Sequence, residues 1–229
     1  FITSGKNAGT VLVTAKTDEE AKHKGISVFI VPKDTPGLKV GQEEDKMGLR
    51  ASDTTDLLFN DCRVHKNNLL GAEGDGFKIA MSGLDSGRIG IAAQSIGVAR
   101  AAFDTAVKYA KQRKQFGQPI SKHQAIRFQI ADMATRIEAA QQLVLSASAM
   151  KDRGERYTKE ASMAKLYASE MVNTVTGMAI QMHGGYGFTK DCSVERNYRD
   201  ARVFTIYEGT SEIQRVVISN NVLKDTRKP

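Results

Sequence analysis

The spacing of the apolar residues changes near residue 72, and this change constrains the fold more than any other feature of the chain. Before it, short runs rich in β-branched residues, such as Thr10–Lys16 and Ile26–Pro32, are bounded by turn residues, which is typical of strands. No long helical pattern separates these runs, so a parallel sheet built from βαβ units is disfavoured. We therefore predict an antiparallel β-sandwich or barrel segment over residues 1–72.

After residue 72, apolar residues recur at the three- and four-residue spacing of helices. Three stripes follow this spacing: Ile89, Ala93, Ile96, Ala99, Phe103 and Ala106; Ile126, Ile130, Met133, Ile137 and Val144; and Ala161, Ala164, Ala168, Met171, Val175 and Met178. Breaks at Pro119 with Ser121, and at Gly154 with Thr158, separate long helices. The stripes predict an antiparallel four-helix-type bundle over residues 73–229, which assigns the whole chain to the α+β class.

The composition narrows the classes of partner and site. The formal net charge of the 229 residues is +7, which allows anionic partners, although a solvated basic surface is the simpler explanation. No apolar run approaches the length of about 20 residues that a membrane helix needs. Cys62 and Cys192 lie far apart and indicate free thiols in a reducing compartment, and no Cys/His cluster has metal-ligand spacing. A start at Phe1, inside an apolar run, suggests a fragment without a visible targeting segment.

A single carboxylate, Glu208, lies between an aromatic residue and a glycine in the segment Ile206–Arg215. Ser211 and Gln214 fit a capping box, which predicts that a helix begins near Ser211. Glu208 then lies in the preceding loop, and the residues alone leave three roles open: a solvated acid, part of the cap, or a proton acceptor. A nearby helix N-terminus stabilises the Glu208 anion, whereas burial raises the pKa of a carboxyl group. The spacing of the residues alone therefore does not decide which of the three roles Glu208 has.

Three further stretches each allow a structural and a functional interpretation. The glycine-rich segment Met182–Phe188 fits a helix C-terminus with a turn, or a close backbone approach to a ligand. The cations of Lys111–Ile120 fit a helix C-terminus, or a phosphate site to which Arg113 brings its forked donors. Asp85 and Arg88 fit a helix surface pair, or a site for a polar ligand.

Taken together, these stretches resemble the acyl-CoA dehydrogenase family, in one order along the whole chain. The resemblance rests on the following segments: FITSG, DKMGLRASDTTDLLFNDCRV, LDSGRIGIAAQSIGVA, RKQFGQPISKHQAI, QMHGGYGFTKDCSVERNYRDAR and IYEGTSEIQR. It implies that residues 1–72 are the late part of a middle β-domain and residues 73–229 a C-terminal helical domain. The family's N-terminal helical domain and first β-domain strands have no counterpart here.

The resemblance also implies an activity, the FAD-dependent oxidation of an acyl-CoA thioester to a trans-2-enoyl-CoA. In this reaction Glu208 removes the α-proton, the β-hydrogen leaves as hydride, and a neighbouring backbone N–H polarises the thioester carbonyl. The motif YEGT points to the short- or medium-chain group, and the overall similarity to butyryl-CoA dehydrogenases favours short linear acyl chains. Half of the implied cofactor site lies outside this chain, so activity of the chain alone stays open.

Site roles and partners follow from the same resemblance, position by position. The implied cofactor contacts are Phe1, Ile2, Thr3, Arg113, Gln124, Gln181, Met182, His183, Gly184, Gly185, Thr210, Ser211 and Glu212. The implied substrate contacts are Asp85, Arg88 and Gly209. Because FAD is held by two subunits, we expect a homotetramer formed as a dimer of dimers, with electron-transfer flavoprotein as the electron acceptor. We expect a bacterial cytoplasmic location, with the mitochondrial matrix as the alternative.

Two other interpretations stay open from the sequence. The basic composition allows a relative that has turned to nucleic-acid binding, although the intact Glu208 disfavours this reading. The helical stripes also allow a non-catalytic oligomerisation fragment.

Overall fold

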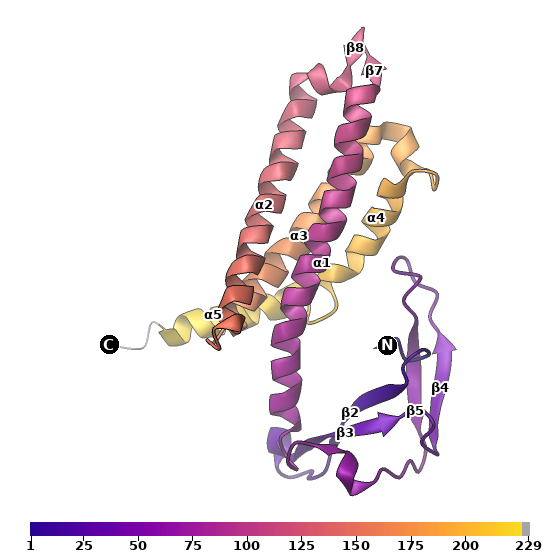
Figure 1. Cartoon of the computed structure of the whole chain (residues 1–229), viewed down its shortest axis with the longest axis vertical. Helices are drawn as coiled ribbons and strands as arrows, with labels where there is room; N and C mark the ends of the chain where they lie inside the picture. The colour runs from indigo at the N-terminus through magenta and orange to yellow at the C-terminus, as the bar shows by residue number, and fades with distance from the viewer. Residues whose placement is uncertain (226–229) are drawn as a thin grey trace. The chain divides into compact units, whose positions relative to one another are not determined.

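The structure is a computed structural model that describes residues 1–225, and its contacts divide the chain into two compact units. The first unit ends at Leu84 and the second begins at Asp85. Strands dominate the first unit and helices the second (Figure 1), so the predicted α+β class is confirmed. Gly76 and Phe77 belong to the first unit because Gly76 packs against Ile26 and the Phe77 ring lies 5.6 Å from His23.

The first unit contains two antiparallel three-stranded sheets, with strand orders β1-β5-β4 and β2-β3-β6. Their bounds are β1 (Ile2–Thr3), β2 (Thr10–Lys16), β3 (Ile26–Pro32), β4 (Leu38–Glu43), β5 (Thr54–Phe59) and β6 (Leu69–Leu70). β2 and β3 coincide with the two predicted runs and pair along their full lengths. The β-branched residues and the flanking turn residues thus located both strands, and Val28 and Val31 of β3 are buried.

The second unit contains long helices joined by connecting segments, and the first helix begins within the last residues of the first unit. The α-helices of the described chain are α1 (Gly76–Gln112), α2 (Gln124–Asp152), α3 (Thr158–His183), α4 (Ser193–Ala201) and α5 (Ser211–Asp225). A two-stranded hairpin of β7 (Lys114–Gln115) and β8 (Gln118–Pro119) links α1 to α2. Gly154, with a φ of 70°, lies in the turn between α2 and α3. Both predicted breaks therefore separate helices, and the antiparallel bundle is visible in Figure 1.

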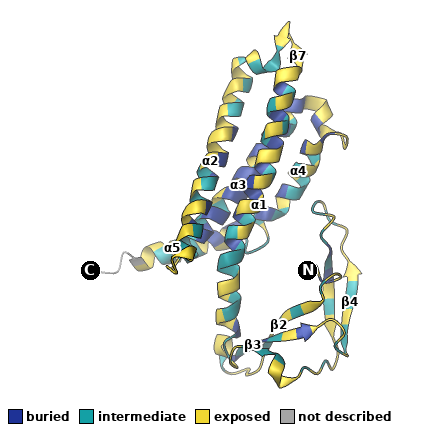
Figure 2. Cartoon of the chain, viewed as in Figure 1, coloured by how far each residue is buried: buried dark blue, intermediate teal, exposed yellow. Residues whose placement is uncertain are grey.

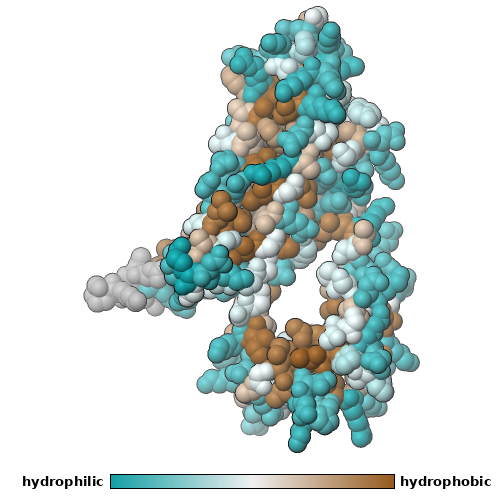
Figure 3. All heavy atoms as spheres, viewed as in Figure 1, coloured by the Kyte–Doolittle hydropathy of each residue, from teal (hydrophilic) through white to brown (hydrophobic). Residues whose placement is uncertain are grey.

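The core of the second unit is centred on α3, which packs against α2, α4 and α5. Figure 2 shows its buried residues between the neighbouring helices, and Figure 3 shows hydrophobic side chains gathered there. The predicted stripe on α3 is buried from Ala161 to Val175, and the stripe on α2 is buried at Met133, Ile137 and Val144. The packing interpretation of these stripes is thus correct.

The stripe predicted on α1 is partly wrong. Ile96, Ala99 and Ala106 are buried as expected, but Ala93 is exposed and its neighbour Ala92 is fully buried. The error arises because alanine and glycine occur on several sides of α1, so the apolar period does not define a single face.

No helix within residues 1–225 has the length and apolar character needed to cross a membrane. In the same part of the chain, His, Cys, Asp and Glu side chains form no group suited to a metal ion.

Candidate functional site

The centre of the site is a strained turn that carries Glu208. Glu208 and Gly209 both have positive φ angles, 53° and 85°, in the loop between the 3-10 helix Arg202–Thr205 and α5. Left-handed backbone costs a residue with a side chain on the order of 1 kcal/mol, so the surroundings must hold Glu208 in place. The carbonyl of Val203 fixes the start of the turn, because it accepts from the N–H groups of Ile206 and Tyr207.

The Glu208 side chain lies directly against α1 at a glycine. A Cβ placed on Gly87 would lie 2.6 Å from Glu208 Oε2 and 2.9 Å from its Cδ, so the carboxylate occupies space that any other residue would fill. Glu208 Oε2 is buried and has no hydrogen-bond partner. A buried carboxylate oxygen without a partner is costly, which makes it a candidate for chemistry.

Tyr207, next to Glu208, is fixed by its own contacts. Its hydroxyl donates to Gln94 Oε1 of α1 at 2.7 Å, and its ring stacks on Phe204 with a centroid distance of 5.8 Å. Burial raises the pKa of Tyr207 far above its ordinary value, and the negative charge of Glu208 adds to this increase. Tyr207 therefore remains protonated and can only donate or accept hydrogen bonds.

The cap of α5 differs from the predicted capping box. The helix begins at Ser211 as expected, but the Thr210 hydroxyl is the group that accepts from the Ile213 N–H, at 3.3 Å. The Ser211 hydroxyl is buried without a partner. Gln214 does not reach back to the cap, because its amide donates to the carbonyls of Glu208 and Gly209. The capping-box assignment was wrong by one residue, and Gln214 has a different role.

Replacement of the cap residue tests this assignment. We expect Thr210→Ala to lower the free energy of unfolding by about 1 kcal/mol, because it leaves an N-terminal N–H of α5 without its acceptor. We expect Ser211→Ala to change the free energy of unfolding little or to raise it, because it removes an unpartnered buried hydroxyl. Urea unfolding of the two variants measures both effects, and the opposite ranking would restore Ser211 as the cap.

A buried lysine supports the same turn. Lys165 of α3 is fully buried, and its Nζ donates to the carbonyl of Gly209 at 2.7 Å. Burial, together with the positive charge of Arg88, lowers the pKa of Lys165 to about 8, although the negative charges of Glu170, Glu208 and Glu212 act in the opposite direction. Lys165 is thus a buried cation near the Glu208 carboxylate.

The lowered pKa of Lys165 predicts a specific pH dependence. Between pH 8 and pH 10.5, the ordinary pKa of lysine, the unfolded chain holds a proton on Lys165 that the folded chain has released. The folded protein therefore gains stability through this window, and below pH 8 this contribution is constant. We expect the unfolding free energy of the parent, relative to Lys165→Met, to rise by up to about 3 kcal/mol across the window. Urea unfolding of both proteins from pH 7 to 10.5 checks this, and parallel curves would contradict it.

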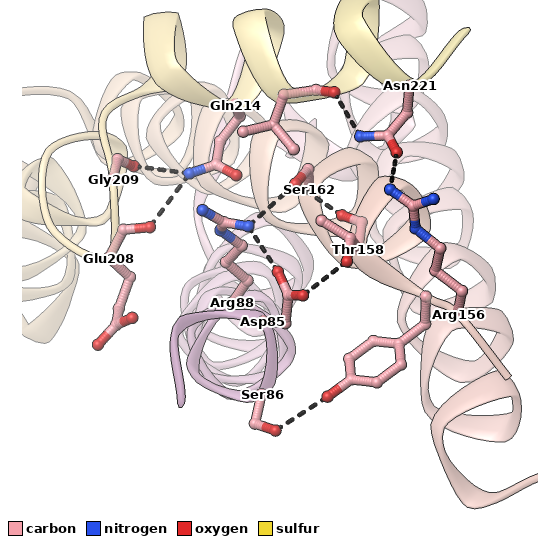
Figure 4. A network of polar contacts seen from close by, with 12 residues as sticks. Asp85, Ser86, Arg88, Arg156, Thr158, Ser162, Glu208, Gly209, Gln214 and Asn221 are labelled. Carbon is pink, nitrogen blue, oxygen red and sulfur yellow. Dashed lines mark hydrogen bonds and ion pairs between the residues drawn. The ribbon is translucent and has the colours of Figure 1, made fainter. Parts of the chain in front are cut away.

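Asp85 and Arg88, the predicted substrate contacts, lie in an internal polar network (Figure 4). Arg88 is buried and pairs with Asp85 at 2.7 Å, while Asp85 also accepts from the Thr158 hydroxyl at 2.6 Å. Arg88 Nη1 also lies 3.5 Å from the Ser162 hydroxyl, and the Nε of Arg88 is buried without a partner. The network fixes α1 against α3 near Gly87, and the predicted contact with substrate stays a prediction.

Several predicted cofactor residues line one cavity of about 470 Å³. The structure brings together Arg113, at the end of α1, and the segment Gln181–Gly185, at the end of α3. His183 stacks on Tyr109 at 4.3 Å, so the cavity combines aromatic rings, an arginine and exposed glycine backbone. Such a wall suits a flat ring that carries phosphate groups. The predicted glycine turn is present, with a φ of 62° at Gly184.

The remaining predicted cofactor residues lie elsewhere. Thr210, Ser211 and Glu212 line a second cavity of about 420 Å³ at the start of α5, together with Arg202. Phe1 is exposed, and Ile2 and Thr3 form β1 in the first unit. Gln124 is exposed as the first residue of α2 and does not line the 470 Å³ cavity. The contacts of all these residues with a cofactor stay predictions.

Sequence reasoning missed three residues that shape the site: Gly87, Lys165 and the amide of Gln214. The sequence did contain a signal that Lys165 is buried, because it lies four residues after Ala161 and three before Ala168, inside the buried face of α3. Gly87 had none, because only the folded chain brings Glu208 against it.

Comparison with known proteins places both units in one family. Residues 1–62 match the family model described as the acyl-CoA dehydrogenase middle domain, and residues 74–223 match the C-terminal domain. A short-chain specific acyl-CoA dehydrogenase, mitochondrial, from Bos taurus is 52% identical over 99% of this chain and 55% of its own length. Subunit CarC of the caffeyl-CoA reductase-Etf complex from Acetobacterium woodii is 52% identical over 98% of this chain and 59% of its own length.

A solved structure agrees with these relatives. Butyryl-CoA dehydrogenase from Megasphaera elsdenii has a TM-score of 0.96 and 48% identity, covering 97% of this chain and 58% of that chain. The chain therefore spans somewhat more than half the length of the relatives it matches.

Proposed function

The chain belongs to the acyl-CoA dehydrogenase family, and from this membership we propose that the protein catalyses flavin-dependent α,β-dehydrogenation of short-chain acyl-CoA to trans-2-enoyl-CoA. The observation that carries the proposal is the Glu208 carboxylate, which has a buried oxygen without a hydrogen-bond partner. The relatives named for short-chain acyl-CoA and butyryl-CoA support this substrate class.

We propose FAD as the cofactor because the residues of the second unit fit it. The aromatic rings and Arg113 of the 470 Å³ cavity suit a flat ring and a pyrophosphate, and the start of α5 offers N–H groups to an anion. When bound, FAD would supply the acceptor for a hydride.

Glu208 has the proton-transfer role in this proposal. Its carboxylate accepts the proton from C2 of the acyl group, so the C2–H bond breaks and an O–H bond forms. The electron pair of the C2–H bond becomes the C2=C3 double bond as the hydrogen on C3 leaves with its own electron pair. Negative charge grows on the thioester oxygen during this step. The Glu208 N–H donates to no acceptor within residues 1–225, so it is available to that oxygen.

The reverse reaction is a second candidate. The Acetobacterium woodii relative is named for caffeyl-CoA reductase and is as similar to this chain as the Bos taurus dehydrogenase. Reduction of an enoyl-CoA uses the same groups, because Glu208 would then return a proton to C2.

We also propose a redox partner, an oligomeric state and a cellular location for the protein. The Etf complex named for the Acetobacterium woodii relative supports electron-transfer flavoprotein as the redox partner. We propose a homotetramer formed as a dimer of dimers, and a bacterial cytoplasmic location with the mitochondrial matrix as the alternative. We also propose a domain boundary at residues 72 and 73, which lies between the two matched ranges. The nucleic-acid and oligomerisation interpretations find no support in the relatives named above.

The flavin spectrum tests the proposed function. We expect the protein purified from its complete reading frame to be yellow and to lose its flavin absorbance when butyryl-CoA is added without oxygen. Added crotonyl-CoA should restore the absorbance of chemically reduced protein, and the faster direction distinguishes dehydrogenase from reductase. A colourless protein, or a flavin that neither acyl-CoA alters, would contradict the proposal.

A further inference from the structure

The conformation of the Glu208 turn depends on side chains from two other parts of the second unit. Two consecutive residues, Glu208 and Gly209, are left-handed, and the carboxylate makes no hydrogen bond through its buried Oε2. No hydrogen bond therefore holds that oxygen, and its place depends on the backbone from which the side chain starts and on the contact with Gly87. Anything that shifts the two carbonyl groups of the turn also shifts the carboxylate.

Two buried donors hold these carbonyl groups. Lys165 Nζ and Gln214 Nε2 both donate to the Gly209 carbonyl, at 2.7 and 3.0 Å, and Gln214 Nε2 also donates to the Glu208 carbonyl at 3.1 Å. Both side chains are fully buried. A Cβ at Gly209 would lie 2.7 Å from Gln214 Nε2, so any other residue there would have to displace the Gln214 amide.

We propose, on the basis of the function proposed above, that Lys165 and Gln214 are positioning residues for proton abstraction, because together they fix the Glu208–Gly209 carbonyls and so hold the Glu208 carboxylate against Gly87. The two residues come from different helices, α3 and α5, so the turn is held from two sides. Figure 4 shows the Gln214 amide directed at both carbonyls while the Glu208 side chain points away from it. Neither residue transfers a proton itself.

A purely structural role predicts a different result from a positioning role. Loss of a structural donor lowers stability without a particular effect on the chemical step. Loss of a positioning donor misplaces the base, and a displacement of about 1 Å slows a reaction by about 10²-fold. The test therefore has to measure proton removal separately from stability and from hydride transfer.

The probe is 3-thiabutyryl-CoA, whose sulfur replaces C3, so that no β-hydrogen can leave as hydride. We measure exchange of its C2 hydrogens with D₂O by mass spectrometry, using the flavin-loaded protein from the complete reading frame. We expect Lys165→Met and Gln214→Met each to slow exchange by about 10²-fold. The dissociation constant of the probe should change less than about threefold, because the acyl-CoA contacts are unaltered. The double variant should be little slower than either single variant, because both side chains donate to the Gly209 carbonyl.

Thr176→Val is the matched control. Thr176 is also fully buried on α3, but its hydroxyl donates within its own helix, to the Val172 carbonyl at 2.7 Å. We expect this variant to lose stability and to keep the parent exchange rate. If Lys165→Met fails to fold, Gln214→Met decides the matter.

The outcomes separate the two proposals. If the parent exchanges its C2 hydrogens and both methionine variants exchange them equally fast, the positioning role is overturned and the proposed function stands. The positioning role would also be overturned if the methionine variants slowed exchange no more than Thr176→Val does at the same loss of melting temperature. Absence of exchange in the parent would remove the proposed function and, with it, the positioning role.

Discussion

Glu208→Gln should lower the rate of flavin reduction by butyryl-CoA by between about 10² and 10⁴-fold, while the flavin content stays unchanged. Glutamine has nearly the same shape as glutamate but cannot accept the C2 proton as a base. Its amide also replaces a carboxylate oxygen that is buried without a partner, so we expect no loss of stability. The loss of rate is therefore the direct effect of removing the base.

Stopped-flow absorbance in the absence of oxygen measures this rate, and the flavin-to-protein absorbance ratio measures cofactor content. Glu138→Gln is the matched control, because Glu138 is exposed on α2 and bonds only to Gln142 within its own helix among the hydrogen bonds described. It should react at the parent rate. A Glu208→Gln protein that reduces its flavin at the parent rate would sink the assignment of Glu208 as the base.

The sequence predicted strands, turns and buried helix faces correctly where the residue types within a segment and the residues that flank it indicated the same structure. The runs at Thr10–Lys16 and Ile26–Pro32 became strands with the predicted bounds, because β-branched residues and flanking turn residues agree there. The turn at Gly154 and the buried face of α3 followed from glycine and apolar spacing in the same way. The α1 stripe failed at Ala93 because alanine marks no particular face of a helix.

The candidate site could be predicted only in part, since its geometry depends on contacts between distant segments. The family's motifs pointed to Glu208, and the structure adds that its turn is left-handed and its carboxylate lies against α1. Lys165 was not foreseen because a spacing rule treats lysine as a surface residue, whereas here a carbonyl acceptor on another segment stabilises it inside the core. The capping-box pattern pointed to Ser211, because Gln214 lies three residues after it, whereas Thr210 has Ile213 at that spacing and still provides the cap.

At Gly87, the addition of a single methyl group should lower the reaction rate without lowering the stability of the fold. We expect Gly87→Ala to lower the rate of flavin reduction by about 10²-fold, because the new Cβ would lie 2.6 Å from Glu208 Oε2 and displace the carboxylate. Its nearest neighbours are atoms of the Glu208 carboxyl group, which is the end of a flexible side chain, so the carboxylate can move aside without disturbing the core. Alanine favours the helical backbone over glycine by about 0.5–1 kcal/mol, which offsets the cost of that movement.

Gly90→Ala supplies the matched comparison for this prediction. Gly90 is exposed on the same helix, and a Cβ there meets nothing within 4 Å, so it should gain about 0.5–1 kcal/mol of stability and keep the parent rate. Urea unfolding and anaerobic flavin reduction of the two variants measure both quantities. Equal rates for the parent, Gly87→Ala and Gly90→Ala would show that the carboxylate does not act from its position against Gly87. A slow Gly87→Ala protein of parent stability would instead show that the position of the carboxylate, rather than the stability of the fold, limits the reaction.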